Sequence, residues 1–199
     1  LTCGTTWHAA GLVTQLRATH TMTELCRYGP VLYGALQAET GQATGFKANG
    51  SLQVARTPGR LTEVARMISL GQVFGVEARM VGPAEAKELY PLLDESKVLG
   101  GGFIPGDGQT NPIDTTIALA KGARQAGVRI IERVAVTGFE ITGGAVRGVV
   151  TDQGTIACEV VANCAGIWAR DIGRLAGVNV PLYAAEHMYV TTEADAAIP

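Results

Sequence analysis

The sequence predicts a soluble α/β protein, and three features of the chain support this prediction. Its 26 glycines are spread over all 199 residues, as expected where many tight turns join helices and strands. A helix pattern that begins at Asn111 leads directly into a strand pattern at residues 128–132. Residues 160–164 are almost entirely apolar, which is typical of a strand buried on both faces of a sheet.

The first helix is predicted by a capping box formed by Thr21 and Glu24. Apolar side chains then recur at helical spacing as far as Gly41, a residue type common just past a helix end. Pro30 is expected to kink this helix. Residues 50–56 follow with alternating apolar and polar side chains, which is the pattern of a half-exposed strand.

Two more helices are predicted where a proline stands in the first turn. Thr57 caps the first of them and Pro58 begins it, and the apolar periodicity ends near residues 71–75. A shorter helix begins at Pro83 and ends before Pro91.

The pattern of residues 111–176 predicts a helix, three short strands and a further helix. Asn111 and Pro112 cap and begin a helix that runs to Gly127, and a last helix covers residues 168–176. The short strands are residues 135–141, 146–151 and 155–158, with a Gly143-Gly144 hairpin turn between the first two.

Composition and charge exclude several functional classes. The net charge is −2 and the basic residues are scattered, so we expect no nucleic-acid partner and no anionic membrane surface. No apolar run approaches the roughly 20 residues of a membrane-spanning helix. The four cysteines stand at irregular separations and are expected to be free thiols.

The beginning of the chain predicts a missing segment. Leu1 is not an initiator methionine, and no GxGxxG dinucleotide fingerprint is present. Either the protein binds no dinucleotide, or its first βαβ unit lies upstream of Leu1. We expect the second case.

The stretch G-T-T-W-H-A-A-G places His8 between small residues and next to Trp7. No second histidine or cysteine stands at metal-ligand spacing, so no metal site is expected. Small neighbours let a flat group approach the backbone, although an ordinary tight turn would look the same. A second candidate is the turn Ala165-Gly166 between a predicted strand and helix, which many α/β proteins carry without a ligand.

Six motifs, taken together, resemble the flavin-containing part of the sarcosine and dimethylglycine dehydrogenases, relatives of D-amino-acid oxidase. The likeness covers essentially the whole chain. In order, the motifs are G-T-T-W-H-A-A-G-L from Gly4, E-T-G from Glu39, L-Y-P-L-L from Leu89, P-G-D-G from Pro105, N-C-A-G-I-W-A from Asn163, and H-M-Y-V-T-T from His187.

The resemblance implies a flavin site. In that family the histidine of the W-H-x-A-G motif carries FAD covalently through an imidazole nitrogen, and His8 matches it. Val136 is expected to touch the adenine end with its backbone, although an ordinary strand valine would look the same. The other expected flavin contacts are Gly4, Thr5, Thr6, Trp7, Ala9, Ala10, Gly11, Leu12, Ala165, Gly166 and Trp168.

The resemblance also implies catalytic residues. His187 and Tyr189 stand two apart on a predicted strand and therefore share one face, where they are expected to position an amine substrate over the flavin. Without the resemblance, the two side chains could equally be a solvent-facing pair.

The implied reaction is the oxidative demethylation of an N-methylated glycine such as sarcosine or dimethylglycine, with hydride transfer to the covalent flavin. Electrons would pass to an electron-transfer flavoprotein or to oxygen. Tetrahydrofolate would be handled only by a C-terminal region outside these residues. The implied location is the mitochondrial matrix in a eukaryote and the cytoplasm in a bacterium.

The implied fold is the D-amino-acid oxidase type, an FAD/NAD(P)-binding α/β fold with an interleaved α+β substrate domain. Residues 1–45 and 106–181 are expected to be FAD-binding segments, residues 46–105 a substrate-domain segment, and residues 182–199 the start of a second one. Two alternatives remain: a non-catalytic regulatory relative, such as the regulatory subunit of pyruvate dehydrogenase phosphatase, and an inactive fragment.

Overall fold

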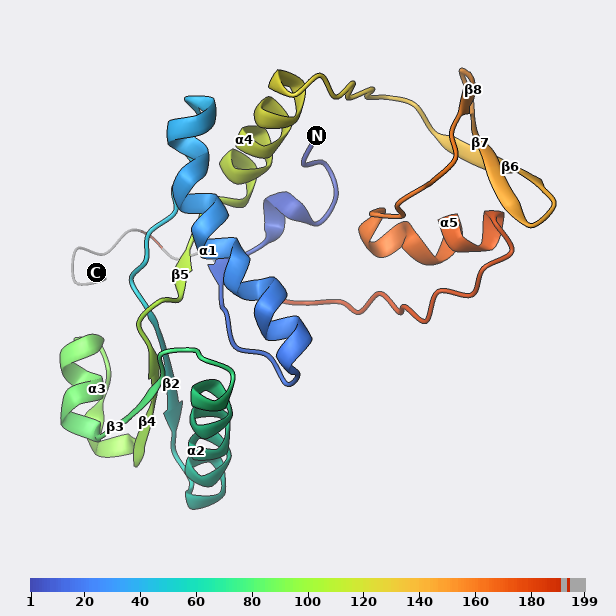
Figure 1. Ribbon diagram of the computed structural model, residues 1–199. Helices are drawn as coiled ribbons and strands as arrows, with labels where there is room; N and C mark the ends of the chain where they lie inside the picture. Colours follow the sequence, from blue (N-terminus) through green and yellow to red (C-terminus); the bar gives the residue numbers. More distant parts are fainter. Residues whose placement is uncertain (191–192, 194–199) are drawn as a thin grey trace. The chain divides into compact units, whose positions relative to one another are not determined.

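The computed structural model describes residues 1–190 and 193 (Figure 1). These residues divide into two compact units. One unit combines Leu1–His8 with Val128–Val190, and the other contains Ala9–Gly127. No helix among the described residues is long and apolar enough to cross a membrane.

The unit of residues 9–127 is built around a three-stranded antiparallel sheet in the order β2-β4-β3. Helix α2 lies against this sheet (Figure 1). The core between them contains Ala55, Val64, Ile68, Val76, Ala78 and Ile104. The elements are β2 (Ser51–Ala55), α2 (Pro58–Val73), β3 (Arg79–Val81) and β4 (Gly100–Ile104).

Glycines in β4 let its neighbours approach closely. A Cβ on Gly101 would lie 2.3 Å from the carbonyl oxygen of Gln53 in β2. A Cβ on Gly102 would lie 2.7 Å from Ile68 Cδ1 on α2, which is inside van der Waals contact. The G-G-G run is therefore a packing surface for β2 and α2.

The predicted proline-led helices are confirmed. The Thr57 hydroxyl accepts a hydrogen bond from Arg60 N at 3.3 Å at the start of α2. Asn111 Oδ1 accepts from Ile113 N at 3.0 Å at the start of α4 (Pro112–Gln125). Helix α3 (Pro83–Leu89) also begins at its proline, and the short 3-10 helix η2 (Glu95–Lys97) precedes β4.

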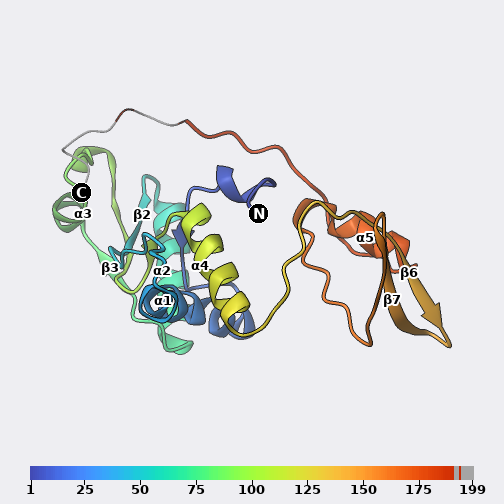
Figure 2. The ribbon, with the colours of Figure 1, turned by 90° about the horizontal axis from the view of Figure 1, so that it is seen from above.

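Helix α1 (His20–Thr40) lies beside α4 (Figures 1 and 2). The two helices approach where Gly122 faces Thr40, because a Cβ on Gly122 would lie 3.2 Å from Thr40 Cγ2. The helix ends at Gly41 as predicted, with a backbone φ of 69° at that glycine. It continues through Pro30 without being ended by it.

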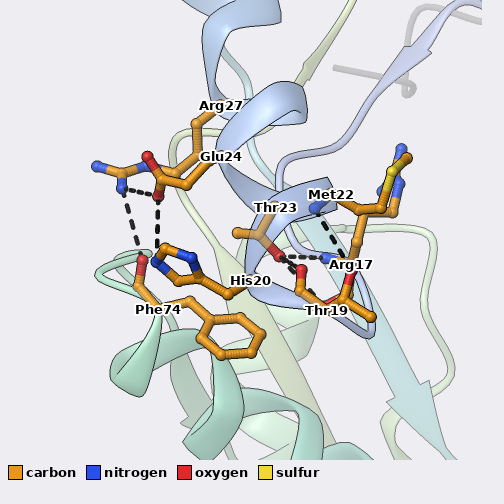
Figure 3. Close-up of polar contacts among 8 residues, drawn as sticks. All are labelled: Arg17, Thr19, His20, Met22, Thr23, Glu24, Arg27 and Phe74. Carbon is orange, nitrogen blue, oxygen red and sulfur yellow. Dashed lines mark hydrogen bonds and ion pairs between the residues drawn. The ribbon is translucent and has the colours of Figure 1, made fainter.

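The predicted start of α1 is wrong by two residues. Its N-cap is Thr19, whose hydroxyl accepts a hydrogen bond from Met22 N at 3.4 Å (Figure 3). Thr21 lies inside the helix. Glu24 pairs instead with Arg27 at 2.7 Å. Thr19 has an extended backbone, and this conformation decides which threonine caps the helix.

Near its start, α1 is joined to the end of α2. Arg27 Nη1 lies 3.5 Å from the carbonyl oxygen of Phe74, and the rings of His20 and Phe74 meet edge to face with centroids 5.3 Å apart (Figure 3). Strand β1 (Leu12–Val13), which precedes α1, pairs with β5 (Gly108–Gln109).

The other unit contains a three-stranded antiparallel meander followed by a short helix. The Gly143-Gly144 hairpin turn is confirmed, with φ of 62° and 77°, a conformation that favours glycine. The elements are η1 (Thr6–His8), β6 (Val136–Thr142), β7 (Ala145–Thr151), β8 (Gly154–Ala157), η3 (Gly166–Trp168) and α5 (Ala169–Leu175).

Three predicted strands do not form among the described residues. Residues 128–132, 160–164 and 187–190 have no strand assignment, and residues 191–192 of the last prediction lie outside the described part. Val160 is 83% exposed and not buried. A strand is stabilised by hydrogen bonds to a neighbouring strand, and none pairs with these segments in the described structure.

Candidate flavin-binding site

His8 ends the 3-10 turn η1 and lies between two aromatic side chains. Its ring stacks on Trp7 with centroids 3.6 Å apart and planes inclined by 33°. On its other side, His8 Nδ1 lies 3.2 Å from the hydroxyl oxygen of Tyr189. All three residues belong to the same unit and are exposed, so the imidazole is accessible to a bound group.

The beginning of this turn packs against a second tryptophan. A Cβ on Gly4 would lie 3.1 Å from the ring of Trp168, so the absence of a side chain lets the turn and the ring meet. Trp168 ends η3, just after Ala165 and Gly166. Gly166 has a φ of 56°, which glycine adopts without strain. The structure thus brings together the two motifs that the sequence proposed as flavin contacts.

The other predicted contacts of the first motif follow His8 in the chain. Ala9, Ala10, Gly11 and Leu12 belong to the unit of residues 9–127. The carbonyl of Gly11 accepts a hydrogen bond from Thr110 N at 2.8 Å, and a Cβ on Gly11 would lie 2.0 Å from the Thr110 carbonyl oxygen. Gly11 therefore serves the packing of its own unit. Leu12 is 75% exposed.

Val136 and His187 are not placed beside His8 by any described contact. Val136 begins β6 opposite Thr151, where it is 37% exposed. His187 is exposed, as is Met188 beside it. Because residues 187–190 form no strand, the structure does not support the shared face that the strand pattern predicted for His187 and Tyr189.

Sequence reasoning missed the role of Asp107 in the P-G-D-G motif. Its side chain is 1% exposed, and Oδ1 accepts a hydrogen bond from Gln15 N at 2.8 Å. Oδ2 accepts from the Ser51 hydroxyl at 2.5 Å, and the backbone carbonyl accepts from Gly50 N at 2.8 Å. Asp107 thereby ties the segment after β1 to the start of β2. The P-G-D-G motif marks Asp107 in the sequence, but it does not indicate which residues hydrogen-bond to the carboxylate.

An apolar hollow lies between the meander and α5. It has a volume of about 310 Å³ and is lined mostly by aliphatic side chains, among them Ile141, Val161 and Ile172. Val161 belongs to the predicted strand that has no partner among the described residues. Among residues 1–190 and 193, no group of three or more His, Cys, Asp or Glu side chains is placed to hold a metal ion.

Comparison with known proteins connects this geometry to a family. The model of the family described as "DAO: FAD dependent oxidoreductase" matches residues 1–198. The chain is 45% identical to 4-methylaminobutanoate oxidase (formaldehyde-forming) of Paenarthrobacter nicotinovorans, over 98% of this chain and 24% of that protein. It is 43% identical to human mitochondrial sarcosine dehydrogenase, over 97% of this chain and 22% of that protein.

Two further relatives bear on function. Rat mitochondrial dimethylglycine dehydrogenase is 37% identical, and mouse mitochondrial pyruvate dehydrogenase phosphatase regulatory subunit is 36% identical. Each match covers 96% of this chain and 22% of the relative. The chain thus spans about a quarter of the length of the curated relatives it matches. Sequence identity therefore does not distinguish a similarity to dimethylglycine dehydrogenase from a similarity to the phosphatase regulatory subunit.

Solved structures show the same fold. L-proline dehydrogenase from P. horikoshii aligns with a TM-score of 0.82 at 30% identity, covering 88% of this chain and 46% of that one. Glycine oxidase from Bacillus cereus aligns with a TM-score of 0.73 at 25% identity, covering 87% of this chain and 48% of that one. The predicted fold class and family resemblance are confirmed, and the chain belongs to the DAO family of FAD-dependent oxidoreductases.

Proposed function

We propose that the protein containing this chain holds FAD on His8 and oxidises the N-methyl group of a small amino acid. The observation that carries the proposal is the exposed imidazole of His8, stacked on Trp7 and in contact with the hydroxyl of Tyr189. A neutral imidazole is a good nucleophile, and this one is exposed on its turn.

The residues present are suited to a flat aromatic group. Trp7 and Trp168 are each 53% exposed. Trp7 belongs to the turn that carries His8, and the ring of Trp168 packs against Gly4 just before that turn. Gly4 contributes no side chain where the turn meets Trp168. Exposed aromatic surface beside a side-chain-free backbone is what an isoalloxazine ring needs in order to stack closely.

Each part of the predicted site has a proposed role. FAD would supply the two-electron chemistry when bound. His8 would hold the flavin, the backbone at Ala165 and Gly166 would pass beside it, and Val136 would touch the adenine end. His187 and Tyr189 remain the proposed side chains on the substrate side.

The proposed substrate class follows from the relatives. Three of the four are named for acting on sarcosine, dimethylglycine or 4-methylaminobutanoate. Loss of a hydride from the N-methyl carbon gives an iminium, and water converts it to formaldehyde and the demethylated amine. We propose electron-transfer flavoprotein or oxygen as the acceptor. The mitochondrial names of two of these relatives support a matrix location if the source is a eukaryote.

The deciding experiment measures covalent flavin on the full-length protein. The wild type, His8→Ala and His20→Ala are purified from flavin-replete cells, denatured in acid and washed. The absorbance near the flavin band and the intact mass of each chain are then recorded. His20 is a matched control because it is an exposed histidine whose contacts are with Glu24 and Phe74. We expect flavin on the wild type and His20→Ala, and none on His8→Ala.

Substrate is tested with the same preparations. Sarcosine, dimethylglycine and 4-methylaminobutanoate are added anaerobically, and bleaching of the flavin absorbance is followed. Bleaching by one of them identifies the substrate. A wild-type chain without covalent flavin would contradict the proposal and favour a non-catalytic role like that of the phosphatase regulatory subunit.

A further inference from the structure

We propose that Asp152 and Gln153 are positioning residues for the adenine end of FAD. They lie in the turn between β7 and β8, and they hold the backbone that leads into β6, where Val136 begins the strand. The proposal rests on the proposed function, because Val136 is the residue expected to contact the adenine. All three residues belong to the unit that combines Leu1–His8 with Val128–Val190.

The turn binds the segment before β6 through three hydrogen bonds. Asp152 Oδ1 accepts a hydrogen bond from Ala135 N at 3.0 Å, and Asp152 N donates to the Ala135 carbonyl at 3.0 Å. Gln153 Nε2 donates to the carbonyl of Arg133 at 2.9 Å. The turn therefore holds residues 133–135 at both ends.

Arg133 has a backbone conformation that needs this support. Its φ is 59°, in the left-handed region that residues with a Cβ rarely adopt. A residue stays in such a conformation only where its surroundings hold it, and such residues are concentrated at ligand-binding and active sites. Gln153 binds the carbonyl of Arg133, whereas the Arg133 side chain is exposed. The hydrogen bond from Gln153 thus stabilises the backbone of Arg133 and does not fix its guanidinium.

The same contacts determine which way the backbone of Val136 faces. Successive residues of an extended strand direct their N–H and C=O groups to opposite edges. Ala135 directs both of its groups toward Asp152, so Val136 directs its own groups away from β7. Among the described residues, β6 pairs only with β7. The N–H and C=O of Val136 therefore face the open edge of the sheet.

A β-bulge follows Val136 directly. Val136 pairs with Thr151 and Gly138 pairs with Val150, so β6 has one extra residue between these two pairs. Bulges bend a strand, interrupt its regular pairing and are over-represented next to active sites. The backbone of Val136 is thus held between the left-handed residue Arg133 on one side and a bulge on the other.

The hydrogen-bonding groups of adenine match this edge. Adenine N1 accepts a hydrogen bond and its N6 amino group donates one, so the N–H and C=O of one residue can bind both. Hypoxanthine has the reverse pattern, because its N1 carries a proton and its O6 accepts. The two bases therefore distinguish hydrogen bonding to the Val136 backbone from stacking alone.

The test measures the preference of the protein for FAD over its hypoxanthine analogue. Full-length apoprotein is made in riboflavin-starved cells and given an equimolar excess of both flavins. Free flavin is removed by gel filtration, and the adenine and hypoxanthine released from the protein by hydrolysis are measured. We expect the wild type to prefer FAD roughly tenfold, as mismatched hydrogen bonds predict. Gln153→Ala should reduce this preference to about twofold, because the backbone before Val136 is then released.

Gln42→Ala is the matched control. Gln42 Nε2 also donates to a backbone carbonyl, that of Ala43 at 3.1 Å, but it belongs to the other unit. We expect this variant to keep the wild-type preference. The proposal is overturned if Gln153→Ala also keeps it, or if the wild type takes up both flavins equally.

A pair of substitutions at Arg133 tests the backbone conformation itself. Arg133→Asn and Arg133→Val both remove the charge, but asparagine tolerates a positive φ and a β-branched residue does not. We expect Arg133→Asn to keep the preference for FAD and Arg133→Val to lose it. The same preference in both variants would show that the left-handed conformation does not position the adenine.

The proposed function and this proposal fail in different ways. A wild-type protein that retains neither flavin contradicts the proposed function. A wild-type protein that retains both without preference upholds flavin binding and contradicts only the positioning of the adenine by Asp152 and Gln153.

Discussion

The hydroxyl of Ser51 lies 2.5 Å from Oδ2 of Asp107, across 56 residues of sequence. The other carboxylate oxygen accepts from the backbone and side chain of Gln15, at 2.8 and 3.4 Å. A carboxylate that is only 1% exposed must be fully hydrogen-bonded, and this one is satisfied by two distant segments. The P-G-D-G motif is therefore a structural link within the unit of residues 9–127.

Asp107→Ala should destabilise the protein by about 2–4 kcal/mol, because it leaves Ser51 and Gln15 donors without their acceptor. Urea denaturation of the full-length protein, followed by circular dichroism, measures the change. Asp171→Ala is the control, since that side chain is 67% exposed and pairs with Arg174 at the surface. Its effect should stay within about 0.5 kcal/mol. Equal effects of the two substitutions would show that Asp107 is not a link.

Gly102→Ala should destabilise the protein by about 1–3 kcal/mol through overpacking. The added Cβ would lie 2.7 Å from Ile68 Cδ1 and 2.9 Å from Val64 Cγ1, both on α2. Gly59→Ala is the matched substitution, because nothing lies within 4 Å of its added Cβ. That variant should be neutral or stabilising, since alanine favours a helix more than glycine does. The shift in thermal midpoint distinguishes the two.

Thr19→Ala should cost about 1 kcal/mol of stability, because it removes the N-cap of α1. Thr21→Ala should change stability little, since Thr21 lies inside the helix and is exposed. The comparison by denaturant midpoint separates the two threonines that the sequence pattern confused. A larger loss of stability in Thr21→Ala than in Thr19→Ala would indicate that the helix begins at the capping box of Thr21 and Glu24.

Gly4→Val should reduce covalent flavin in acid-denatured protein. The Cβ alone would lie 3.1 Å from the Trp168 ring, and the further methyl groups would push the turn away from it. The control is Gly34→Ala, because no atom lies within 4 Å of a Cβ added at Gly34. Alanine is used at this position because valine would disfavour the helix. Retention of full covalent flavin by Gly4→Val would show that contact with Trp168 does not support the histidine turn.

The Asp94 carboxylate should titrate below the ordinary range of aspartate. Hydrogen bonding to the Ser96 side chain is the main cause of its lowered pKa, followed by Lys97. Because the folded pKa is depressed, this contribution to stability is present above the unfolded pKa and is lost as pH falls through the folded pKa. Ser96→Ala should move the Asp94 pKa upward toward its ordinary value, as NMR titration of the carboxyl carbon would show. An unchanged pKa in that variant would exclude Ser96 as the cause.

Local chemistry explains the parts of the fold that the sequence predicts well. Thr57 with Pro58, and Asn111 with Pro112, determine helix starts within a single turn of chain, because the cap and its partners are sequence neighbours. Paired glycines at 143 and 144 similarly determine the hairpin. The same short range explains the error at α1, where two threonines only two positions apart, Thr19 and Thr21, were both possible caps.

The sequence by itself therefore determined the starts of the proline-led helices, the hairpin, the family and the candidate histidine, because each depends on neighbouring residues or on motifs in order along the chain. Tertiary structure alone decided which apolar segments become strands, since residues 128–132 and 160–164 need a partner strand for their backbone hydrogen bonds. It alone also brought Ser51 to Asp107 and Tyr189 to His8. Those contacts join residues far apart in the chain, and only the folded backbone brings them within hydrogen-bonding distance.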